Sequence, residues 1–177
     1  MLVFYGSMRE HFTEAIVLTR EPSLEQDIRV SLYTRTLGKV SAKITSGRRV
    51  TSKLSPHLDI LHIAKVRLVE TGGFQVADAL RVGSLPSTFE SFRAVHVVEQ
   101  SVVSLQPDFR LWSALRHGNN TLRRALVVLG FDPSLASCVR CGYARPRYFS
   151  IWDSDYTCSW CFTSIGSPFQ NYVDLLV

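Results

Sequence analysis

The residues best suited to chemistry in this sequence are four cysteines in two closely spaced pairs. Cys138 pairs with Cys141 and Cys158 pairs with Cys161, which gives the spacing C-x2-C-x16-C-x2-C. Two residues between paired cysteines let one tight turn direct both sulfurs at the same ion, and two such turns complete a tetrahedron of thiolates. Because four protein ligands leave no open coordination position, the spacing predicts one structural Zn2+ ion and not a catalytic one.

The same cysteines allow two other interpretations, a pair of local disulfides or a redox-active C-x-x-C motif. A redox motif normally occurs once, beside a βαβ pattern that this sequence does not show. The apolar start over residues 1–5 is very short and makes a poor signal peptide. No stretch approaches the roughly 20 apolar residues that span a bilayer. We therefore expect an intracellular protein with no membrane contact, in which paired cysteines usually indicate a metal.

A second signal is the concentration of positive charge in the first half of the chain. The whole chain has a formal net charge of +5, an excess too modest to establish nucleic-acid binding by itself. Between residues 35 and 67, however, eight basic residues face a single acid, Asp59. We predict that these basic residues contact DNA; they are Arg35, Lys39, Lys43, Arg48, Arg49, Lys53, Lys65 and Arg67.

Different parts of this basic region suit different contacts. The loop over residues 46–53 combines Arg48 and Arg49 with hydroxyl groups and a glycine, which suits binding to phosphates. The lysines and Arg67 on the flanking strands are expected to line a groove, and Tyr33 is a candidate stacking surface for a base. The alternative is a solvated strand face, because lysines also protect the exteriors of barrels.

No pattern in the sequence predicts an enzyme. The five histidines are scattered without metal-ligand spacing. A nucleophile elbow, a Walker A sequence and a Gly-x-Gly-x-x-Gly motif are all absent from the sequence. Asp153 and Asp155 are spaced for a turn before Cys158 more than for an acid–base pair. We therefore expect a protein that binds and does not catalyse.

The basic residues must be positioned by β-strands, because apolar and polar residues alternate around them. Turns at Leu37-Gly38 and Gly72-Gly73 separate the alternating stretches. A small closed barrel protects the edges of such a set of short strands, so we expect a five-stranded β-barrel over residues 1–82. The expected strands are residues 14–20, 27–34, 39–45, 65–70 and 74–80.

After Pro86 the pattern becomes helical. Residues 87–90 have the spacing of a capping box, Pro107-Asp108 is suited to open a second helix, and Asn119-Asn120 a third that ends at Gly130. We therefore expect an α+β fold in which a helical domain over residues 83–177 carries the zinc finger at 138–161. A short apolar tail over residues 172–177 closes the chain.

In this order the pieces resemble the bacterial recombination mediator RecO. The first matching segment runs from Glu14 to Leu18, through residues 27–30, to the turn Thr34-Arg35-Thr36-Leu37-Gly38-Lys39, and on to Gly47-Arg48-Arg49 and Ser52-Lys53. The second runs from Leu129 to Leu135, into Cys138 to Gly142, and then to Tyr148-Phe149-Ser150. Each motif is moderately specific, and their order and spacing together carry the resemblance.

The resemblance implies an OB-fold barrel, a helical domain and a four-cysteine zinc finger. It also implies a role in DNA repair and homologous recombination in the bacterial cytoplasm, at the nucleoid. RecO proteins bind single- and double-stranded DNA, anneal complementary strands and engage single-strand-binding protein. With RecR they help to load RecA onto coated single strands. Family members usually continue for several helical turns beyond the finger, so we expect a shortened C-terminal helical region here.

Two other functions fit the same residues. An OB barrel with a zinc ribbon also suits an RNA- or ribosome-binding protein, because OB folds bind either polymer. A basic face also suits a protein–protein adaptor that meets an acidic partner. Affinities for matched single-stranded DNA, RNA and an acidic peptide distinguish the three functions.

Overall fold

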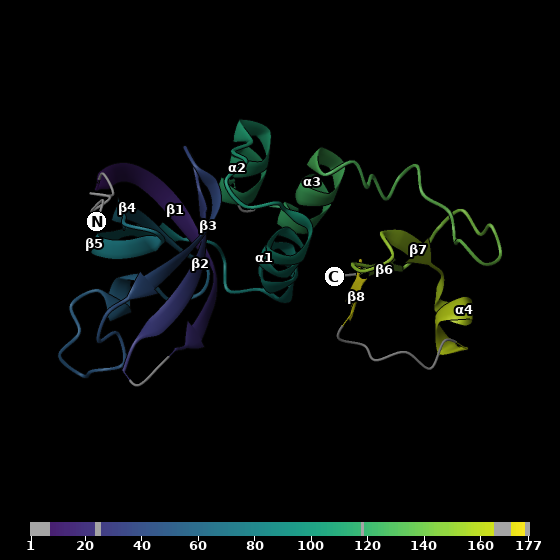
Figure 1. Cartoon of the computed structure of the whole chain (residues 1–177). Helices are drawn as coiled ribbons and strands as arrows, with labels where there is room; N and C mark the ends of the chain where they lie inside the picture. The colour runs from purple at the N-terminus through teal and green to yellow at the C-terminus, as the bar shows by residue number, and fades with distance from the viewer. Residues whose placement is uncertain (1–7, 24–25, 118, 165–170, 176–177) are drawn as a thin grey trace, which may run out of the picture.

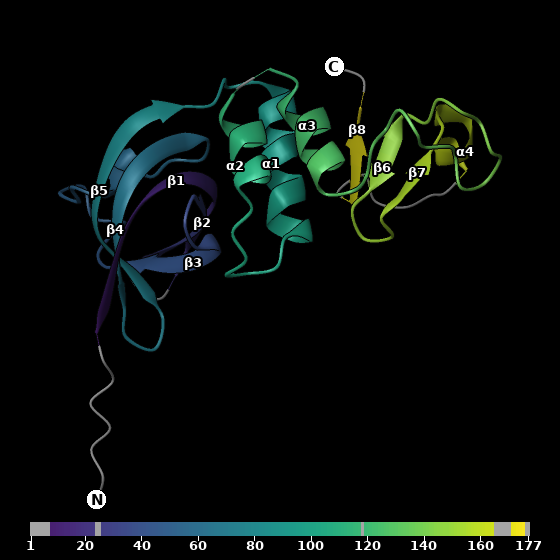
Figure 2. The same ribbon diagram turned by 90° about the horizontal axis from the view of Figure 1, so that it is seen from above.

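The computed structural model describes residues 8–23, 26–117, 119–164 and 171–175. Three parts lie in a row in both views of the ribbon: a β-barrel, a group of helices, and a small sheet with one short helix (Figures 1 and 2). No helix within these described ranges is long and apolar enough to cross a membrane.

The barrel consists of five strands, each of which contains or overlaps an expected stretch. They are β1 (Arg9–Pro22), β2 (Ile28–Thr34), β3 (Gly38–Ile44), β4 (His62–Glu70) and β5 (Phe74–Ser84). The barrel closes in the order β1-β2-β3-β5-β4, and β3 and β5 are its one parallel pair. β1 is longer than expected because its first residues pair with β4. A closed barrel of five strands is the arrangement expected of an OB-fold.

Alternation along the strands fills the barrel with apolar side chains. Val30 and Leu32 of β2 lie opposite Ala42 and Val40 of β3, and all four are buried. Full burial of a side chain such as Leu32 contributes roughly 1.5–3 kcal/mol. The whole interior cluster is Ala15, Val17, Ile28, Val30, Leu32, Val40, Ala42, Ile44, Leu58, Ala64, Val66, Leu68, Val76 and Ala79. The inward faces predicted from the sequence are confirmed.

Three helices follow the barrel: α1 (Phe89–Ser101), α2 (Phe109–Arg116) and α3 (Thr121–Val128). Thr88 caps α1 by accepting from the Ser91 amide, and Asp108 caps α2 by accepting from two amides in its first turn. The helix begins one residue later than the capping box requires, so Ser91 and not Glu90 stands at the third helical position. The Glu90 carboxylate instead accepts from the Leu122 amide at the start of α3. The helical part is smaller than the domain we expected.

The helices pack on the outside of the barrel, and for this reason β1 and β2 are buried on both faces. Ile16 and Leu18 of β1 and Tyr33 of β2 lie in a second apolar cluster with residues of all three helices. The link from α1 to α2 approaches Gly38 so closely that a Cβ atom there would lie 2.3 Å from the Gln106 carbonyl oxygen. Since barrel and helices share a cluster, the domain boundary after residue 82 stays a prediction.

The C-terminal part contains a sheet that we did not expect. Its strands are β6 (Tyr148–Ser150), β7 (Asp155–Thr157) and β8 (Tyr172–Asp174), in the order β7-β6-β8, and the short helix α4 (Ser159–Thr163) follows β7. The part of the apolar tail that the structure describes is thus mostly strand. Phe149 and Val173 bury against the helices in the second cluster.

Candidate nucleic-acid interface and metal centre

The four cysteines meet at one point of the C-terminal part. Their four sulfur atoms lie within 4.8 Å of one another, and the sulfurs of Cys141 and Cys158 are 3.7 Å apart. In a tetrahedral site with Zn–S bonds of about 2.3 Å the sulfurs are separated by about 3.8 Å. The cysteines form no disulfide, and their arrangement suits a metal ion.

Backbone hydrogen bonds shape the two turns that carry the sulfurs. The Gly142 amide donates to the Cys138 carbonyl at 2.8 Å, and Gly142 takes the positive φ of +73° that this turn requires. At the start of α4 the Cys161 amide donates to the Cys158 sulfur. The Val139 amide donates to the Tyr156 carbonyl at 2.8 Å, which ties the first turn to β7.

The thiols of Cys138 and Cys161 differ in their pKa values. Burial and the neighbouring sulfurs raise the pKa of Cys161 to about 12. Burial also favours the protonated form of Cys138, but amide hydrogen bonds from Cys158, Cys141 and Arg140 outweigh it and lower that pKa to about 6. Four sulfurs this close repel one another as thiolates, so full ionisation of the cluster requires a cation among them.

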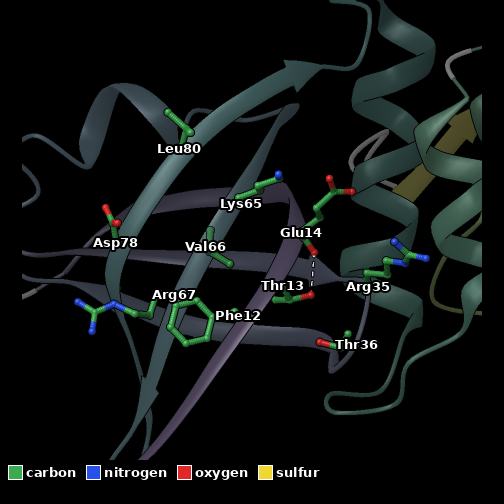
Figure 3. Close-up of a pocket in the computed structure, with 10 residues that line it drawn as sticks. All are labelled: Phe12, Thr13, Glu14, Arg35, Thr36, Lys65, Val66, Arg67, Asp78 and Leu80. Atoms are coloured by element: carbon green, nitrogen blue, oxygen red, sulfur yellow. Dashed lines mark hydrogen bonds between the residues drawn. The ribbon is translucent and has the colours of Figure 1, made fainter.

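The structure places six of the eight predicted DNA contacts on two surfaces of the barrel. Arg35, Lys65 and Arg67 line a hollow of about 710 Å3 over β1, β4 and β5 (Figure 3), which we call the strand surface. Arg48 and Arg49 line shallow hollows at the loop over residues 46–53, where Lys53 is also exposed; we call this the loop surface. Phe12 on the strand surface and Arg20 beside the loop surface are eight positions apart along β1, roughly 26 Å of extended chain.

The strand surface combines basic groups with an exposed aromatic ring. Phe12, whose ring is drawn in Figure 3, has 73% of its surface exposed and lies opposite Arg67 across the β1–β4 ladder. Lys65 lies between Glu14 and Leu80 on the neighbouring strands. Glu14 and Asp78 line the hollow together with its three basic residues, and Arg67 pairs with Glu10 at 3.2 Å, so this surface carries mixed charge.

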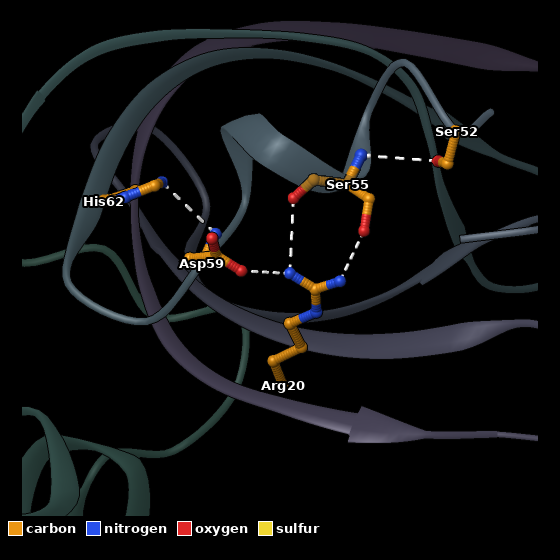
Figure 4. Close-up of polar contacts among 5 residues, drawn as sticks. All are labelled: Arg20, Ser52, Ser55, Asp59 and His62. Atoms are coloured by element: carbon orange, nitrogen blue, oxygen red, sulfur yellow. Dashed lines mark hydrogen bonds and ion pairs between the residues drawn. The ribbon is translucent and has the colours of Figure 1, made fainter. Parts of the chain in front are cut away.

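The loop surface is anchored to the barrel from both ends. The Arg20 guanidinium donates to the Ser55 carbonyl at 3.2 Å, and also contacts the Ser55 hydroxyl and pairs with Asp59 (Figure 4). At the other end Asp27 accepts from the Ser46 amide at 2.8 Å and pairs with Lys43 at 3.0 Å. The Ser46 amide and Lys43 together lower the pKa of Asp27, against a smaller effect of burial.

Some predicted contacts are not brought together. Lys39 donates to the Glu99 carbonyl near the end of α1, and Lys43 is paired with Asp27. Neither lysine is among the described residues that line the hollow with Lys65 and Arg67. The stacking role predicted for Tyr33 is wrong, because α2 covers this part of β2. Tyr33 is fully buried, and its hydroxyl donates to the Asp108 carbonyl and accepts from the Asp108 amide.

Sequence reasoning missed Phe12 as an exposed aromatic residue beside the basic groups. A usable signal was present: if the alternation that places Ala15 inside the barrel is extended backwards, Phe12 falls on the outward face with Glu14. Arg116 was missed as well. It lies at the end of α2 and pairs with Glu14 at 3.1 Å, a contact across more than a hundred residues that no local pattern predicts.

Comparison with known proteins matches the barrel to the family "Recombination protein O N terminal" over residues 8–82. The chain is 32% identical over 175 residues to the DNA repair protein RecO of Thermobifida fusca, covering 84% of this chain and 72% of that protein. It is 26% identical over 170 residues to the protein of that name from Bifidobacterium longum (strain DJO10A), covering 82% and 71%. The chain therefore belongs to the RecO family.

Proposed function

We propose that this protein is a DNA-binding mediator of DNA repair and homologous recombination that acts without a catalytic residue. Its relatives are named DNA repair protein RecO. The observation that carries the DNA contact is the pair Arg48 and Arg49, exposed side by side on a loop that Arg20 and Asp27 anchor. An anchored loop presents its guanidinium groups at a lower cost in conformational entropy than a free one.

Arginine suits this contact because its guanidinium group binds phosphate oxygens through two hydrogen bonds at once. Contacts of this kind release condensed counterions, so affinity falls steeply with salt and depends little on sequence. Lys53 on the same loop adds to the positive field. Annealing follows from screening the phosphates of two complementary strands together and needs no proton transfer or covalent step.

The family supplies the proposed partners. We propose that the protein binds single- and double-stranded DNA, acts with RecR, engages single-strand-binding protein and so helps to load RecA onto coated single strands. The cysteine cluster is proposed to hold one structural Zn2+ ion through Cys138, Cys141, Cys158 and Cys161. Such an ion holds the two turns together and supplies no chemistry to a substrate.

The test of the loop contact replaces both arginines with alanine. The Arg48→Ala/Arg49→Ala variant is expected to bind single- and double-stranded DNA more weakly for all sequences, with its salt dependence reduced by about two phosphate contacts. Arg145→Ala removes an exposed arginine outside the barrel and serves as the control. An unchanged salt dependence in the double variant contradicts the assignment.

Annealing separates the mediator from the alternatives. Two complementary oligonucleotides are coated with the cognate single-strand-binding protein and mixed with and without the protein. Acceleration that fades with added salt supports the mediator function. Binding to naked DNA without acceleration leaves a general nucleic-acid-binding barrel and favours the two alternatives over the mediator. Tighter binding to matched RNA than to single-stranded DNA favours an RNA-binding protein. Binding to an acidic peptide and not to DNA favours an adaptor.

A further inference from the structure

Basic and aromatic side chains continue from the barrel onto the helices. A hollow of about 660 Å3 lies between α2 and α3, and we call it the helix groove. Among the described residues that line it are three arginines and no acidic residue, together with apolar side chains. These lining residues include Phe109, Arg110, Arg123, Arg124, Val127 and Val128. Positive charge in this groove is therefore less opposed than on the strand surface.

Arg35 and Phe109 join the helix groove to the strand surface. Arg35 lines the strand surface and Phe109 lines the groove, and the Arg35 guanidinium carbon lies 5.6 Å from the centre of the Phe109 ring. Figure 3 shows Arg35 at the edge of the strand surface nearest the helices. At the other end of α2, Arg116 pairs with Glu14. Because both ends of α2 contact the barrel, the helix groove is held in a fixed position relative to the strand surface.

Two aromatic rings along this line are exposed to solvent. Phe12 is 73% exposed and Phe109 is 63% exposed, each beside arginine or lysine side chains. A row of basic groups with interleaved aromatic rings is the pattern by which proteins bind single-stranded nucleic acid, since each ring accepts the face of an unpaired base. The bases of a duplex are already stacked on one another and offer no such face.

We propose that a single strand of nucleic acid runs from the strand surface, past the Arg35–Phe109 contact, into the helix groove. Its bases stack on Phe12 and Phe109, and its phosphates lie near Lys65, Arg67 and the arginines of the groove. Of the acids beside this path, Glu14 pairs with Arg116, and Asp108 pairs with Arg110 at 3.4 Å. Asp78 also lines the strand surface, and Glu10 pairs with Arg67, so the helix groove carries the larger positive excess. The inference rests on the proposed DNA-binding function and assigns the single-strand preference to this path, whereas the loop surface accepts either form.

A single strand is favoured over an acidic peptide as the ligand because basic and aromatic side chains occur together both on the strand surface, at Phe12, and in the helix groove, at Phe109. The helix groove alone has the charge and apolar lining that an acidic, apolar peptide segment requires. Such a peptide does not explain why the same combination recurs at Phe12, Lys65 and Arg67 on the adjoining barrel surface. A polymer that repeats a flat base and a negative phosphate fits both hollows.

The experiment compares two phenylalanines in matched positions. Phe109 and Phe89 are each the first residue of a helix, each follows a capping side chain, and Phe89 is 81% exposed. Phe109→Ala in the full chain is expected to weaken binding to a single strand of about 16 nucleotides roughly tenfold and to leave duplex affinity unchanged. Phe89→Ala, which removes a ring away from both hollows, is expected to change neither.

A second variant gives a direct signal of stacking. In Phe109→Trp the tryptophan emission is expected to be quenched when the single strand is added, relative to the parent chain, and Phe89→Trp is expected to show no added quenching. Equal losses for single strand and duplex in Phe109→Ala, or no quenching in Phe109→Trp, overturn the proposal. So does an Arg124→Ala variant that loses affinity for an acidic peptide while its affinity for the single strand is unchanged.

Comparing the Phe109→Ala and Arg48→Ala/Arg49→Ala variants tests the single-strand path separately from the proposed function. If Arg48→Ala/Arg49→Ala weakens both forms of DNA while Phe109→Ala weakens neither, the loop contact stands and the single-strand path fails. If the parent chain binds neither form, both proposals fail together.

Discussion

The barrel and the cysteine-bearing part, residues 138–175, are held together in different ways. The barrel strands are seven to fourteen residues long and close around an apolar interior that belongs to the barrel alone. The C-terminal strands are three residues each. Their buried residues, such as Phe149 and Val173, belong to the cluster centred on the helices. The barrel therefore has an apolar core of its own, whereas the C-terminal strands share a core with the helices.

This difference indicates that the cysteines stabilise the small sheet. Phe149 and Val173 of the small sheet pack in one cluster with residues of the helices, while α4, which begins directly after Cys158, lies farther from the barrel than β8 (Figures 1 and 2). Short strands without an interior of their own are marginal in water. In the proposed zinc site, four cysteine ligands around one ion compensate for the missing apolar surface.

The largest expected effect comes from removing the metal ligands. Cys138→Ser, or a chelator, is expected to release the proposed zinc ion and to abolish amide protection in β6 and β7, because a structural zinc provides folding free energy of order 10 kcal/mol. The barrel amides are expected to keep their protection, since their interior does not touch this region. Metal analysis and hydrogen exchange of the same sample check both statements.

Ser137→Ala, a change at the exposed residue next to the first cysteine, is the matched control and is expected to retain zinc. Unchanged protection of β6 and β7 in metal-free protein would falsify the contrast between the two regions. Equal loss of protection in the barrel would show that the barrel also depends on the metal.

A smaller effect is expected where the barrel meets the helices. Gly38 has a φ of +71°, and a Cβ atom there would lie 2.3 Å from a backbone oxygen that cannot move freely. Gly38→Ala is therefore expected to lower the free energy of unfolding by about 3 kcal/mol or more, through strain and a clash together. Chemical denaturation measures this change.

Alanine substitutions at two further glycines distinguish the cost of backbone strain from the cost of a steric clash. Gly72 has a φ of +81° with open space around it, and Gly73 has open space without a positive φ. Alanine at Gly72 is expected to cost about 1 kcal/mol, and alanine at Gly73 less. If Gly38→Ala costs no more than Gly72→Ala, the close approach of the α1–α2 link to the barrel is not important for stability.

The parts of the fold that follow local rules were predictable from sequence. Alternation with a period of two marks strands such as β3, whose inward residues Val40, Ala42 and Ile44 are buried as expected. The cysteine cluster was predictable because two pairs of close neighbours fix most of its geometry. The strands β6 to β8 were not, because three residues are too few for alternation to be recognised.

The functional surfaces were harder to predict because they depend on which outward residues the helices cover. Tyr33 and Phe12 are both aromatic residues on outward faces of barrel strands, yet Tyr33 is fully buried and Phe12 is exposed. Lys39 looked like Lys65 in the sequence, but α1 lies over Lys39 and not over Lys65. Coverage of this kind is set by packing between segments that are far apart in sequence.

The smallest expected effect uses two buried tyrosines, one in each region. Tyr33 bonds to Asp108 where the barrel meets α2, and Tyr156 of β7 donates to the Phe131 carbonyl at 2.7 Å. Tyr33→Phe and Tyr156→Phe are each expected to cost about 1 kcal/mol at neutral pH, the usual net value of one hydrogen bond. Hydrogen exchange is expected to show the first loss at the barrel–helix contact and the second in the small sheet.

The pH dependence of these two variants distinguishes a buried hydroxyl from an exposed one. Burial raises the pKa of both Tyr33 and Tyr156 above the ordinary value of 10.0. An unfolded chain ionises its tyrosines first as pH rises, so the stabilisation from each buried tyrosine is complete below pH 10.0 and is lost as pH rises through the higher folded pKa. A phenylalanine cannot ionise, so the gap between each variant and the parent chain is expected to narrow above pH 10.0. A gap that stays constant from neutral to alkaline pH would mean that the hydroxyl reaches solvent in the folded protein and that the covering of β2 or of β7 is loose.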